Sequence, residues 1–272
     1  MKYIIYFLLY FYSFSSQAVL SDFKVATWNL QGASSQTESK WNINIRQIIS
    51  GSGAVDILAV QEAGSPPSTA IDTGRVIISP GIPVREFIWN LSTNSRPQQV
   101  YIYFSAIDVF AGRVNLAIVS NRRADDVFVL PAVRSGGRPI MGIRIGTDAF
   151  FTVHAMATRN NDAAQIVNDV YDFFHSHPSP QIQATNWMIL GDFNRQPDEL
   201  EPELQAPTRT HSVIFAPSAP TQTTAMRVLD YAVAGNSIAF SPPNLRANIS
   251  YGARRVQISS DHYPVSITSL KK

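Results

Sequence analysis

The 272-residue chain contains no cysteine. This absence excludes disulfide bonds, a thiol nucleophile and cysteine-ligated zinc, so the fold must be held by its core. Charge is also scarce: charged residues make up 15% of the chain, and a formal net charge of +2 is too small to indicate a polyanionic partner by itself. The hydrophobic content of 45% allows a large core and argues against wholesale disorder.

The sequence also lacks any apolar run of about 20 residues, the length that a membrane-spanning helix needs. A shorter run stands near the beginning, where Lys2 precedes an apolar stretch over residues 3–12 and small residues flank Gln17. A basic start, an apolar segment and a small-x-small site are typical of a secretory signal peptide, whereas a membrane anchor would need a longer run. We therefore predict a signal peptide over residues 1–18, a mature chain that begins near Val19, and a single domain over residues 19–272.

Apolar, β-branched runs of about five to seven residues recur along the chain and are bounded by Gly, Pro, Asn or Asp, a pattern that predicts strands. The predicted strands are residues 23–28, 55–60, 100–104, 114–119, 140–145, 149–153, 187–190, 228–233 and 265–268. Helical spacing predicts helices over residues 41–49 and 163–174. Residues 195–220 are rich in proline and polar residues, which predicts a long surface loop. Many strands with few helices indicate packed sheets with helices outside.

Acidic, amide and imidazole residues recur at the ends of these apolar runs. The set is Asn29, Glu62, His154, Asp192, Asn194, Asp230, Asp261 and His262. Any one of them alone is more typical of a turn or of a hydrogen-bonded structural group. Together they are rich in hard oxygen ligands, which suit Mg²⁺, Mn²⁺ or Ca²⁺, and the two histidines can transfer a proton or stabilise charge on a phosphate. Hydrolysis of a phosphodiester needs these groups.

Six short segments occur in an order and spacing that cover almost the whole mature chain. They are TWNLQG at 27–32, VQE at 60–62, VHA at 153–155, GDFN at 191–194, LDY at 229–231 and SDHYPV at 260–265. In these segments the chain resembles the endonuclease/exonuclease/phosphatase superfamily, of which deoxyribonuclease I is the familiar member. A closer similarity, to the B subunits of cytolethal distending toxins, covers residues 37–51, 105–125 and 138–146. The resemblance implies an α+β fold, a four-layer α/β/β/α sandwich of two mostly antiparallel sheets packed face to face with outer helices.

The resemblance also implies a metal and a water-activating group at one end of the strands. Glu62 would be the principal metal ligand, helped by Asn29 and Asp261. Asp192 would orient or deprotonate the attacking water, and Asn194 would hold the phosphate. The expected ion is Mg²⁺, with Mn²⁺ or Ca²⁺ as alternatives.

Two imidazoles and two arginines complete the implied site. His262 would pair with Asp230 and polarise the scissile phosphate or transfer a proton, and His154 would donate to the phosphate. The His262–Asp230 pairing also makes sense on its own, because a carboxylate on one ring nitrogen fixes the tautomer and raises the proton affinity of the other. Arg113 and Arg144 are predicted phosphate ligands, the alternative being ordinary surface arginines.

The activity that the resemblance implies is a divalent-metal-dependent endonuclease acting on DNA, as the catalytic subunit of a secreted bacterial genotoxin. Such a subunit would be exported through the inner membrane, would assemble with lectin-like A and C subunits, and would act in the host nucleus, where DNA damage arrests the cell cycle. Relatives that use disulfides differ from this chain, so any assembly here must be non-covalent. Arg246, Arg254 and Arg255 would assist nuclear entry or contact phosphates, or would form a solvated basic face.

Two other functions remain open at this point. A phosphoinositide (PIP3) phosphatase on the same scaffold would show a compact basic pocket beside an apolar, membrane-facing loop, whereas a nuclease would show an extended arginine-lined groove. The sequence has no aromatic-rich loop that demands a membrane, which ranks the phosphatase second. A catalytically inactive binding protein is third, because the full set of polar residues is present.

Overall fold

The computed structural model describes residues 19–32, 37–51, 53–78, 83–93, 95–107, 114–157, 161–250 and 260–270. The predicted signal peptide (residues 1–18), Arg113, Arg254 and Arg255 lie outside the described residues. Within the described ranges, no helix is long and apolar enough to cross a membrane.

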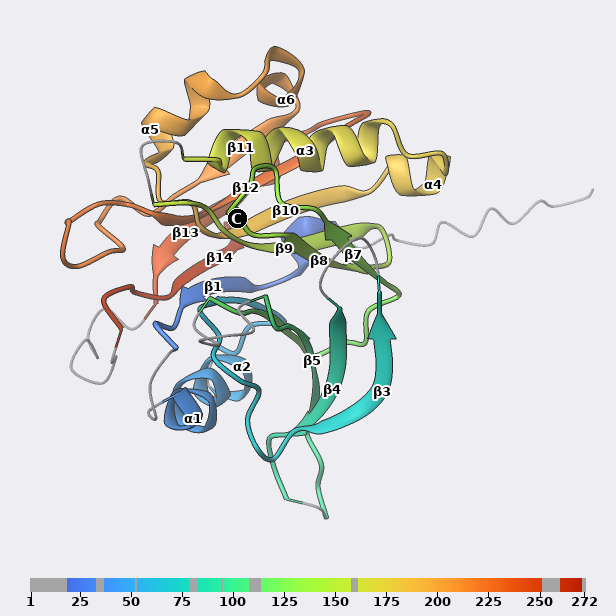
Figure 1. Ribbon diagram of the computed structural model, residues 1–272, viewed down its shortest axis with the longest axis vertical. Coiled ribbons are helices and arrows are strands. Elements are labelled where there is room, and N and C mark those ends of the chain that lie inside the picture. Colours follow the sequence, from blue (N-terminus) through green and yellow to red (C-terminus); the bar gives the residue numbers. More distant parts are fainter. Residues whose placement is uncertain are drawn as a thin grey trace, which may run out of the picture.

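Two β-sheets form the centre of the fold (Figure 1). The first has the order β13-β14-β1-β2-β6-β5-β4-β3, and the second has the order β11-β12-β10-β9-β8-β7. The first sheet contains β1 (Val25–Asn29), β2 (Ile57–Gln61), β3 (Ile71–Ile77), β4 (Val84–Asn90), β5 (Gln99–Ser105), β6 (Leu116–Ser120), β13 (Leu245–Ile249) and β14 (Val265–Ser269). The second contains β7 (Asp126–Leu130), β8 (Ile140–Ile145), β9 (Asp148–His154), β10 (Asn186–Asp192), β11 (Ser212–Phe215) and β12 (Asp230–Asn236).

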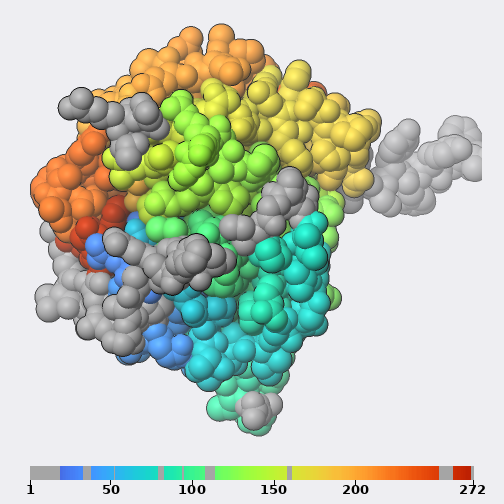
Figure 2. Space-filling view, in the orientation of Figure 1, coloured from blue at the N-terminus to red at the C-terminus, as the bar shows by residue number. Residues whose placement is uncertain are grey.

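Helical segments cover the outer faces of both sheets. On the first sheet lies a continuous segment of α1 (Thr37–Ser39), the π-helix η2 (Lys40–Ile45) and α2 (Arg46–Ser50). On the second lie α3 (Ala163–His175), α4 (Pro180–Gln183), α5 (Pro197–Leu200), η3 (Glu201–Glu203) and α6 (Ala206–Thr210), and a short turn η1 (Leu20–Asp22) precedes β1. In the space-filling view the second sheet and its helices fill the upper half of the molecule and the first sheet the lower half (Figure 2).

Three apolar clusters hold these four layers together. In β2, Ile57 and Ala59 point into the cluster between the sheets, and Leu58 and Val60 point into the cluster beneath the helical segment that contains Trp41. A third cluster packs α3 on the second sheet. Because both faces of the central strands are buried, they appear in the sequence as continuous apolar runs rather than as alternating patterns. The predicted four-layer α/β/β/α sandwich is confirmed.

Each of the nine predicted strand segments overlaps an observed strand, and both predicted helices are present. The prediction of a loop over residues 195–220 is wrong. This stretch contains α5, η3, α6 and β11, and each of its three helical turns carries a proline in its first turn. Proline fits that position because the first N–H groups of a helix have no partner within the helix, so here the prolines start short helices rather than prevent them.

Two parallel strand pairs determine where chemistry can occur. In the described sheets β1–β2 and β9–β10 are parallel and the other pairs are antiparallel. Parallel strands end at the same edge, and the two sheets are joined near that edge by a buried hydrogen bond of 2.9 Å from Gln61 Nε2 to Thr152 Oγ1. The carboxyl ends of all four strands therefore meet at one end of the sandwich.

Candidate active site

The register of the strands brings most of the predicted site residues together. In β9–β10, His154 is paired with Asp192, and in β10–β12, Asp192 is paired with Asp230. Asn29 is the last residue of β1 and is paired with Gln61, which Glu62 follows directly. Side chains that are far apart in the sequence thus lie at one edge of the two sheets.

Asp192 is the hub of the cluster and is almost fully buried. Its Oδ2 lies 3.0 Å from Asn29 Nδ2, which donates to it, 3.6 Å from His154 Nε2 and 3.7 Å from His262 Nε2. Its Oδ1 accepts the backbone N–H of Asn194 at 2.9 Å. One carboxylate oxygen therefore faces two imidazole nitrogens, an arrangement suited to moving a proton between a water molecule and a substrate.

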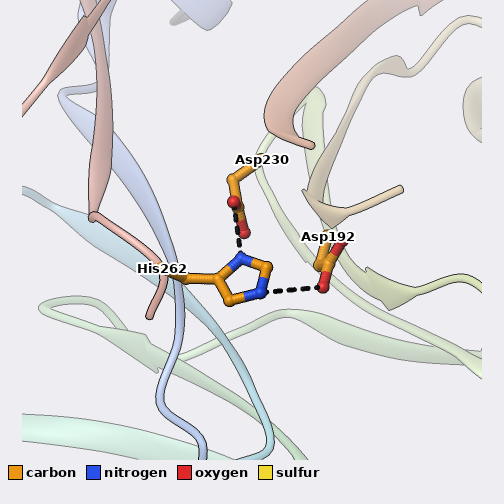
Figure 3. Close-up of side chains that lie close together, drawn as sticks. All are labelled: Asp192, Asp230 and His262. Carbon is orange, nitrogen blue, oxygen red and sulfur yellow. Dashed lines mark hydrogen bonds and ion pairs between the residues drawn. The ribbon is translucent and has the colours of Figure 1, made fainter. Parts of the chain in front are cut away.

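His262 is held between two carboxylates, as Figure 3 shows. Its Nδ1 lies 2.7 Å from Oδ2 of the fully buried Asp230, and its Nε2 points toward Asp192. Burial lowers the pKa of the ring, but the charges of Asp230, Asp192 and Asp261 and the hydrogen bond to Asp230 outweigh it and raise the pKa to about 9. His262 is therefore a protonated imidazolium at neutral pH.

The pKa of Asp192 is also raised, to about 7, because the carboxylate is desolvated and lies near the charge of Asp230; His262 opposes this shift. A carboxyl group that titrates near neutrality can accept a proton from water, and a protonated imidazole can donate one. The cluster thus contains a base, Asp192, and an acid, His262. Asp192 Oδ2 and His262 Nε2 are 3.7 Å apart.

Ligand atoms of Asp192, Asp230 and His262 lie within 4.8 Å of one another, a spacing that a metal ion could also use. We interpret this trio as a proton-transfer unit instead. The Nδ1 atom of His262 is engaged with Asp230, and its Nε2 faces the Asp192 carboxylate, so both ring nitrogens are directed at carboxylate oxygens.

Glu62, Asn29 and Asp261 provide further oxygen ligands that adjoin this cluster: Glu62 Oε1 lies 3.9 Å from His154 Nε2, and Asp261 Oδ1 lies 3.7 Å from His262 Nε2. Asn29 Nδ2 lies 3.5 Å from Glu62 Oε1, and Gln31 links Asn29 to Asp261, since its N–H donates to Asn29 Oδ1 and its Oε1 accepts from the Asp261 N–H. Asp261 Oδ2 accepts from Gln222, while its buried Oδ1 has no hydrogen-bond donor within the described part of the chain. Hard oxygen donors with a buried acceptor fit a divalent cation such as Mg²⁺.

The backbone at this edge is unusual. Gln31, Glu62 and Asn194 have positive φ angles of 49°, 47° and 48°, a conformation that side chains other than glycine rarely adopt. Gln31 and Asn194 lie two residues after the strand ends Asn29 and Asp192, and Glu62 directly follows the end of β2. Gly32 fits tightly against the Glu62 loop, where an added Cβ would lie 1.9 Å from the Glu62 carbonyl oxygen. Such strain persists where surrounding contacts fix the geometry, as is common at active sites.

Asn194 lies in the cluster, but its amide nitrogen donates to the Ala155 carbonyl at 2.9 Å. Since its backbone N–H also holds Asp192, Asn194 joins the ends of β9 and β10 in this structure. Arg113 lies outside the described residues.

The placement of Arg144 corrects its prediction as a phosphate ligand of this site. Arg144 is in β8 beside Ala149 and forms an ion pair with Asp126 of β7. It thus lies at the start of β9, whereas His154 is at the end, and five strand residues of ~3.3 Å each separate the two positions. The structure does not bring Arg144 to the cluster.

Several residues that hold the site in place were not predicted. They are Gln31, Lys40, Trp41, Gln61, Thr221 and Gln222. Lys40 carries no signal of this role in the sequence, because a lysine beside an apolar helical stripe is usually exposed and its burial is visible only in the structure. Thr221, whose hydroxyl accepts the N–H groups of Leu229 and Asp230, carries none either.

Comparison with known proteins gives consistent results. The Endonuclease/Exonuclease/phosphatase family matches residues 26–262. The cytolethal distending toxin B subunit of Escherichia coli is 70% identical over 267 residues, which cover 98% of each sequence. A solved structure of the biologically active subunit of cytolethal distending toxin is 71% identical, with a TM-score of 0.88 over 92% of this chain and 98% of that one. The cytolethal distending toxin of Actinobacillus actinomycetemcomitans gives 48% identity and a TM-score of 0.87 over 93% of this chain and 100% of the matched chain.

Proposed function

Since the chain belongs to the endonuclease/exonuclease/phosphatase family and, within it, to the cytolethal distending toxin B subunits, we propose that it is a metal-dependent endonuclease that hydrolyses DNA phosphodiester bonds. The observation that carries this proposal is the Asp192 carboxylate that faces both His154 and His262. A reaction that activates water and protonates a leaving oxygen needs such a base and acid side by side.

In the proposed mechanism Asp192 accepts a proton from the attacking water. His262, kept protonated by Asp230, stabilises charge on the phosphate or protonates the leaving oxygen, and His154 donates to a phosphate oxygen from the other side. Asn194 fixes the orientation of Asp192 through its backbone N–H. The positions of these groups are set by strand ends, so little reorganisation is needed during the reaction.

The proposed metal-binding residues are Glu62, Asn29 and Asp261, and the proposed ion is Mg²⁺, with Mn²⁺ or Ca²⁺ as alternatives. When bound, the ion supplies positive charge that neutralises phosphate oxygens. Asn29 lies between Glu62 and Asp192 and so keeps the metal-binding and water-activating groups in a fixed relation.

We further propose that the chain works as the active subunit of a toxin. It would be exported by the signal peptide at residues 1–18, assemble non-covalently with A and C subunits, and act on DNA in the host nucleus. The relatives named above support this proposal, since they are subunits of such toxins.

Plasmid nicking by the mature protein tests the activity. With Mg²⁺, nicking is expected from the unaltered protein and from His177→Ala, a matched control whose imidazole lies beyond the end of α3 and accepts from the Ser179 N–H. Nicking is expected to disappear in His154→Ala, in His262→Ala and in EDTA. A parallel assay measures phosphate release from a soluble phosphoinositide. Metal-dependent release of phosphate without nicking would refute the nuclease proposal and support a lipid phosphatase.

A further inference from the structure

Gln222 is a buried glutamine in a short hairpin, residues 222–227, that packs against the segment of Asp261 and His262. Gln222 is 8% exposed, and its backbone forms bridges with Arg227, across the hairpin, and with His262. The Thr223 N–H also donates to the Asp261 carbonyl oxygen at 2.8 Å. The hairpin is thus held to this segment by backbone contacts, which place the Gln222 side chain beside the Asp261 carboxylate.

Both ends of the Gln222 amide are engaged, which fixes its orientation. Its Oε1 accepts the backbone N–H of Ala225 at 2.5 Å, and its Nε2 donates to Asp261 Oδ2 at 3.0 Å. A reversed amide would place a donor against the Ala225 N–H and an acceptor against the carboxylate. The contact with Asp261 is therefore a hydrogen bond from an amide to a carboxylate, which is stronger than one between neutral groups.

The two oxygens of the Asp261 carboxylate have different surroundings. Oδ2 is engaged by Gln222, whereas Oδ1 is buried, lies 3.7 Å from His262 Nε2 and accepts no hydrogen bond from the residues that the structure describes. A second glutamine, Gln31, holds the backbone of Asp261 instead, since its Oε1 accepts the Asp261 N–H at 3.0 Å. Gln31 thus fixes where Asp261 lies, while Gln222 occupies one of its oxygens and leaves Oδ1 for a cation.

A single available carboxylate oxygen does not suit all divalent ions equally. Mg²⁺ demands near-ideal octahedral geometry, which the narrow angle between the two oxygens of one carboxylate does not fit. Ca²⁺ takes about six to eight oxygen ligands in a flexible geometry, and both oxygens of one carboxylate are common among them. A hydrogen bond that occupies Asp261 Oδ2 therefore removes a ligand that Ca²⁺ would use and that Mg²⁺ does not need.

We propose that Gln222 is a specificity-determining residue for the metal: by engaging Asp261 Oδ2 it keeps Asp261 a one-oxygen ligand and so favours Mg²⁺ over Ca²⁺. The inference rests on the proposed function in taking Glu62 and Asp261 as metal-binding residues. Gln222 is a positioning residue, because it acts on the ion through Asp261.

Isothermal titration calorimetry of the mature protein with Mg²⁺ and with Ca²⁺, without nucleic acid, tests this proposal. Gln222→Met keeps the length of the side chain and removes both amide contacts. The ratio of the Ca²⁺ to the Mg²⁺ dissociation constant is expected to fall about tenfold, the scale of one hydrogen bond to a charged group. In Gln31→Met, the matched control, Oδ2 stays bonded to Gln222, so the ratio is expected to remain that of the unaltered protein. An unchanged ratio in Gln222→Met, or an equal fall in Gln31→Met, would overturn the proposal.

Infrared spectra of the carboxylates provide a second measurement, which also applies if Gln222→Met fails to fold. The separation of the antisymmetric and symmetric stretching bands distinguishes a carboxylate that binds a cation through one oxygen from one that binds through both. Isotopic labelling of the aspartate carboxyl carbons separates these bands from those of Glu62. With Ca²⁺, the unaltered protein is expected to show only one-oxygen binding by aspartate, and Gln222→Met to show two-oxygen binding. Two-oxygen binding in the unaltered protein would overturn the proposal.

The outcomes separate this inference from the proposed nuclease. Loss of both ions in Glu62→Gln would verify that calorimetry measures the proposed site, and undiminished binding in that variant would place the ion elsewhere and refute the inference. A shifted ratio in Gln222→Met without nicking by the unaltered protein would refute the nuclease alone. Nicking by the unaltered protein with an unchanged ratio in Gln222→Met would refute the role of Gln222 alone. If the unaltered protein bound neither ion, the inference would also be wrong.

Discussion

The two ends of the parallel pair β9–β10 each carry a buried aspartate in register with a polar partner. At the amino end Asp148 is paired with Asn186, and at the carboxyl end Asp192 is paired with His154. Asp148 and Asp192 are 0% and 1% exposed, and in both the loss of hydration is the largest cause of a raised pKa, to about 6 and about 7. Burial and pKa alone do not distinguish the two ends.

Their partners do distinguish them. The Asp148 oxygens accept from the neutral groups Asn186 Nδ2, at 3.0 Å, and Thr147 Oγ1, at 3.4 Å. Asp192 has one oxygen that faces two imidazoles, and one of these is protonated at neutral pH. Only Asp192 thus combines a raised pKa with imidazole nitrogens, at 3.6 and 3.7 Å, that can exchange a proton with it, a combination typical of functional sites. The Asp148 end is structural by this criterion.

The largest expected effect is the difference in nicking rate between variants of the two aspartates. Asp192→Asn removes the base and is expected to lower the nicking rate by about three orders of magnitude, the scale of general base catalysis. Asp148→Asn, at the other end of the same strands, is expected to nick within about twofold of the unaltered protein. Initial rates on supercoiled plasmid in Mg²⁺ measure both. A comparable loss in Asp148→Asn, with circular dichroism unchanged, would break the distinction between the ends.

Asp230→Asn tests the partner of the imidazole rather than the base. An amide at this position can donate to Nδ1 and so favour the wrong tautomer, and it removes the negative charge that raises the pKa of His262. Nicking is expected to fall by about a hundredfold or more. The pKa of His262, followed by the NMR shift of its Cε1 proton, is expected to drop from about 9 toward its ordinary value, so less of the acid is protonated at neutral pH.

His177 provides the matched signal in the same spectra, because its ring lies far along the chain from Asp230 and contacts Ser179. The chemical shift of its Cε1 proton at a given pH is expected to be the same in Asp230→Asn and in the unaltered protein. A His262 titration that also stayed unchanged would show that Asp230 does not control the charge of the ring.

Asp148 has a measurable consequence for stability. Its pKa is raised in the folded state, so the folded protein binds a proton that the unfolded chain has already released between about pH 4 and pH 6. The contribution of Asp148 to stability is therefore present below pH 4 and is lost as the pH rises through about 6, by up to about 3 kcal/mol. Asp148→Asn is expected to remove this slope, as measured by urea unfolding at pH 4, 5, 6 and 7. Parallel pH profiles for the two proteins would contradict the assignment.

The strand ends that the structure brings together at the candidate site are visible in the sequence. The runs that end at Asn29, Glu62, His154 and Asp192 are continuous and apolar, since both faces of those strands are buried. Strands with less burial were missed: β3 is partly exposed along its length and contains a bulge between Asp72 and Val76, so it shows no regular period.

The supporting residues could not be predicted because their roles depend on contacts through space. Lys40 reaches backbone carbonyls that lie 9 and 10 residues earlier, and Gln61 reaches across to Thr152 in the other sheet, 91 residues away. Neither contact leaves a periodic pattern. The loop prediction for residues 195–220 is wrong for a different reason. The prolines are visible in the sequence, but whether a proline ends or begins a helix depends on its position within the turn.

Replacement of Arg144, which lies near the Asp148 end of β9, is expected to have the smallest effect. Membership of a toxin-like segment favoured a phosphate-binding role, but the register of β8 with β9 places Arg144 beside Ala149 and its guanidinium against Asp126. Arg144→Ala is expected to nick within about twofold of the unaltered protein and to lower the free energy of unfolding by about 1 kcal/mol or less, because Asp126 is partly exposed. The same plasmid assay and urea unfolding measure these values. A nicking rate reduced more than tenfold, with stability intact, would mean that DNA extends along the sheet to this end, and the amino end of β9 would then belong to the substrate-binding surface.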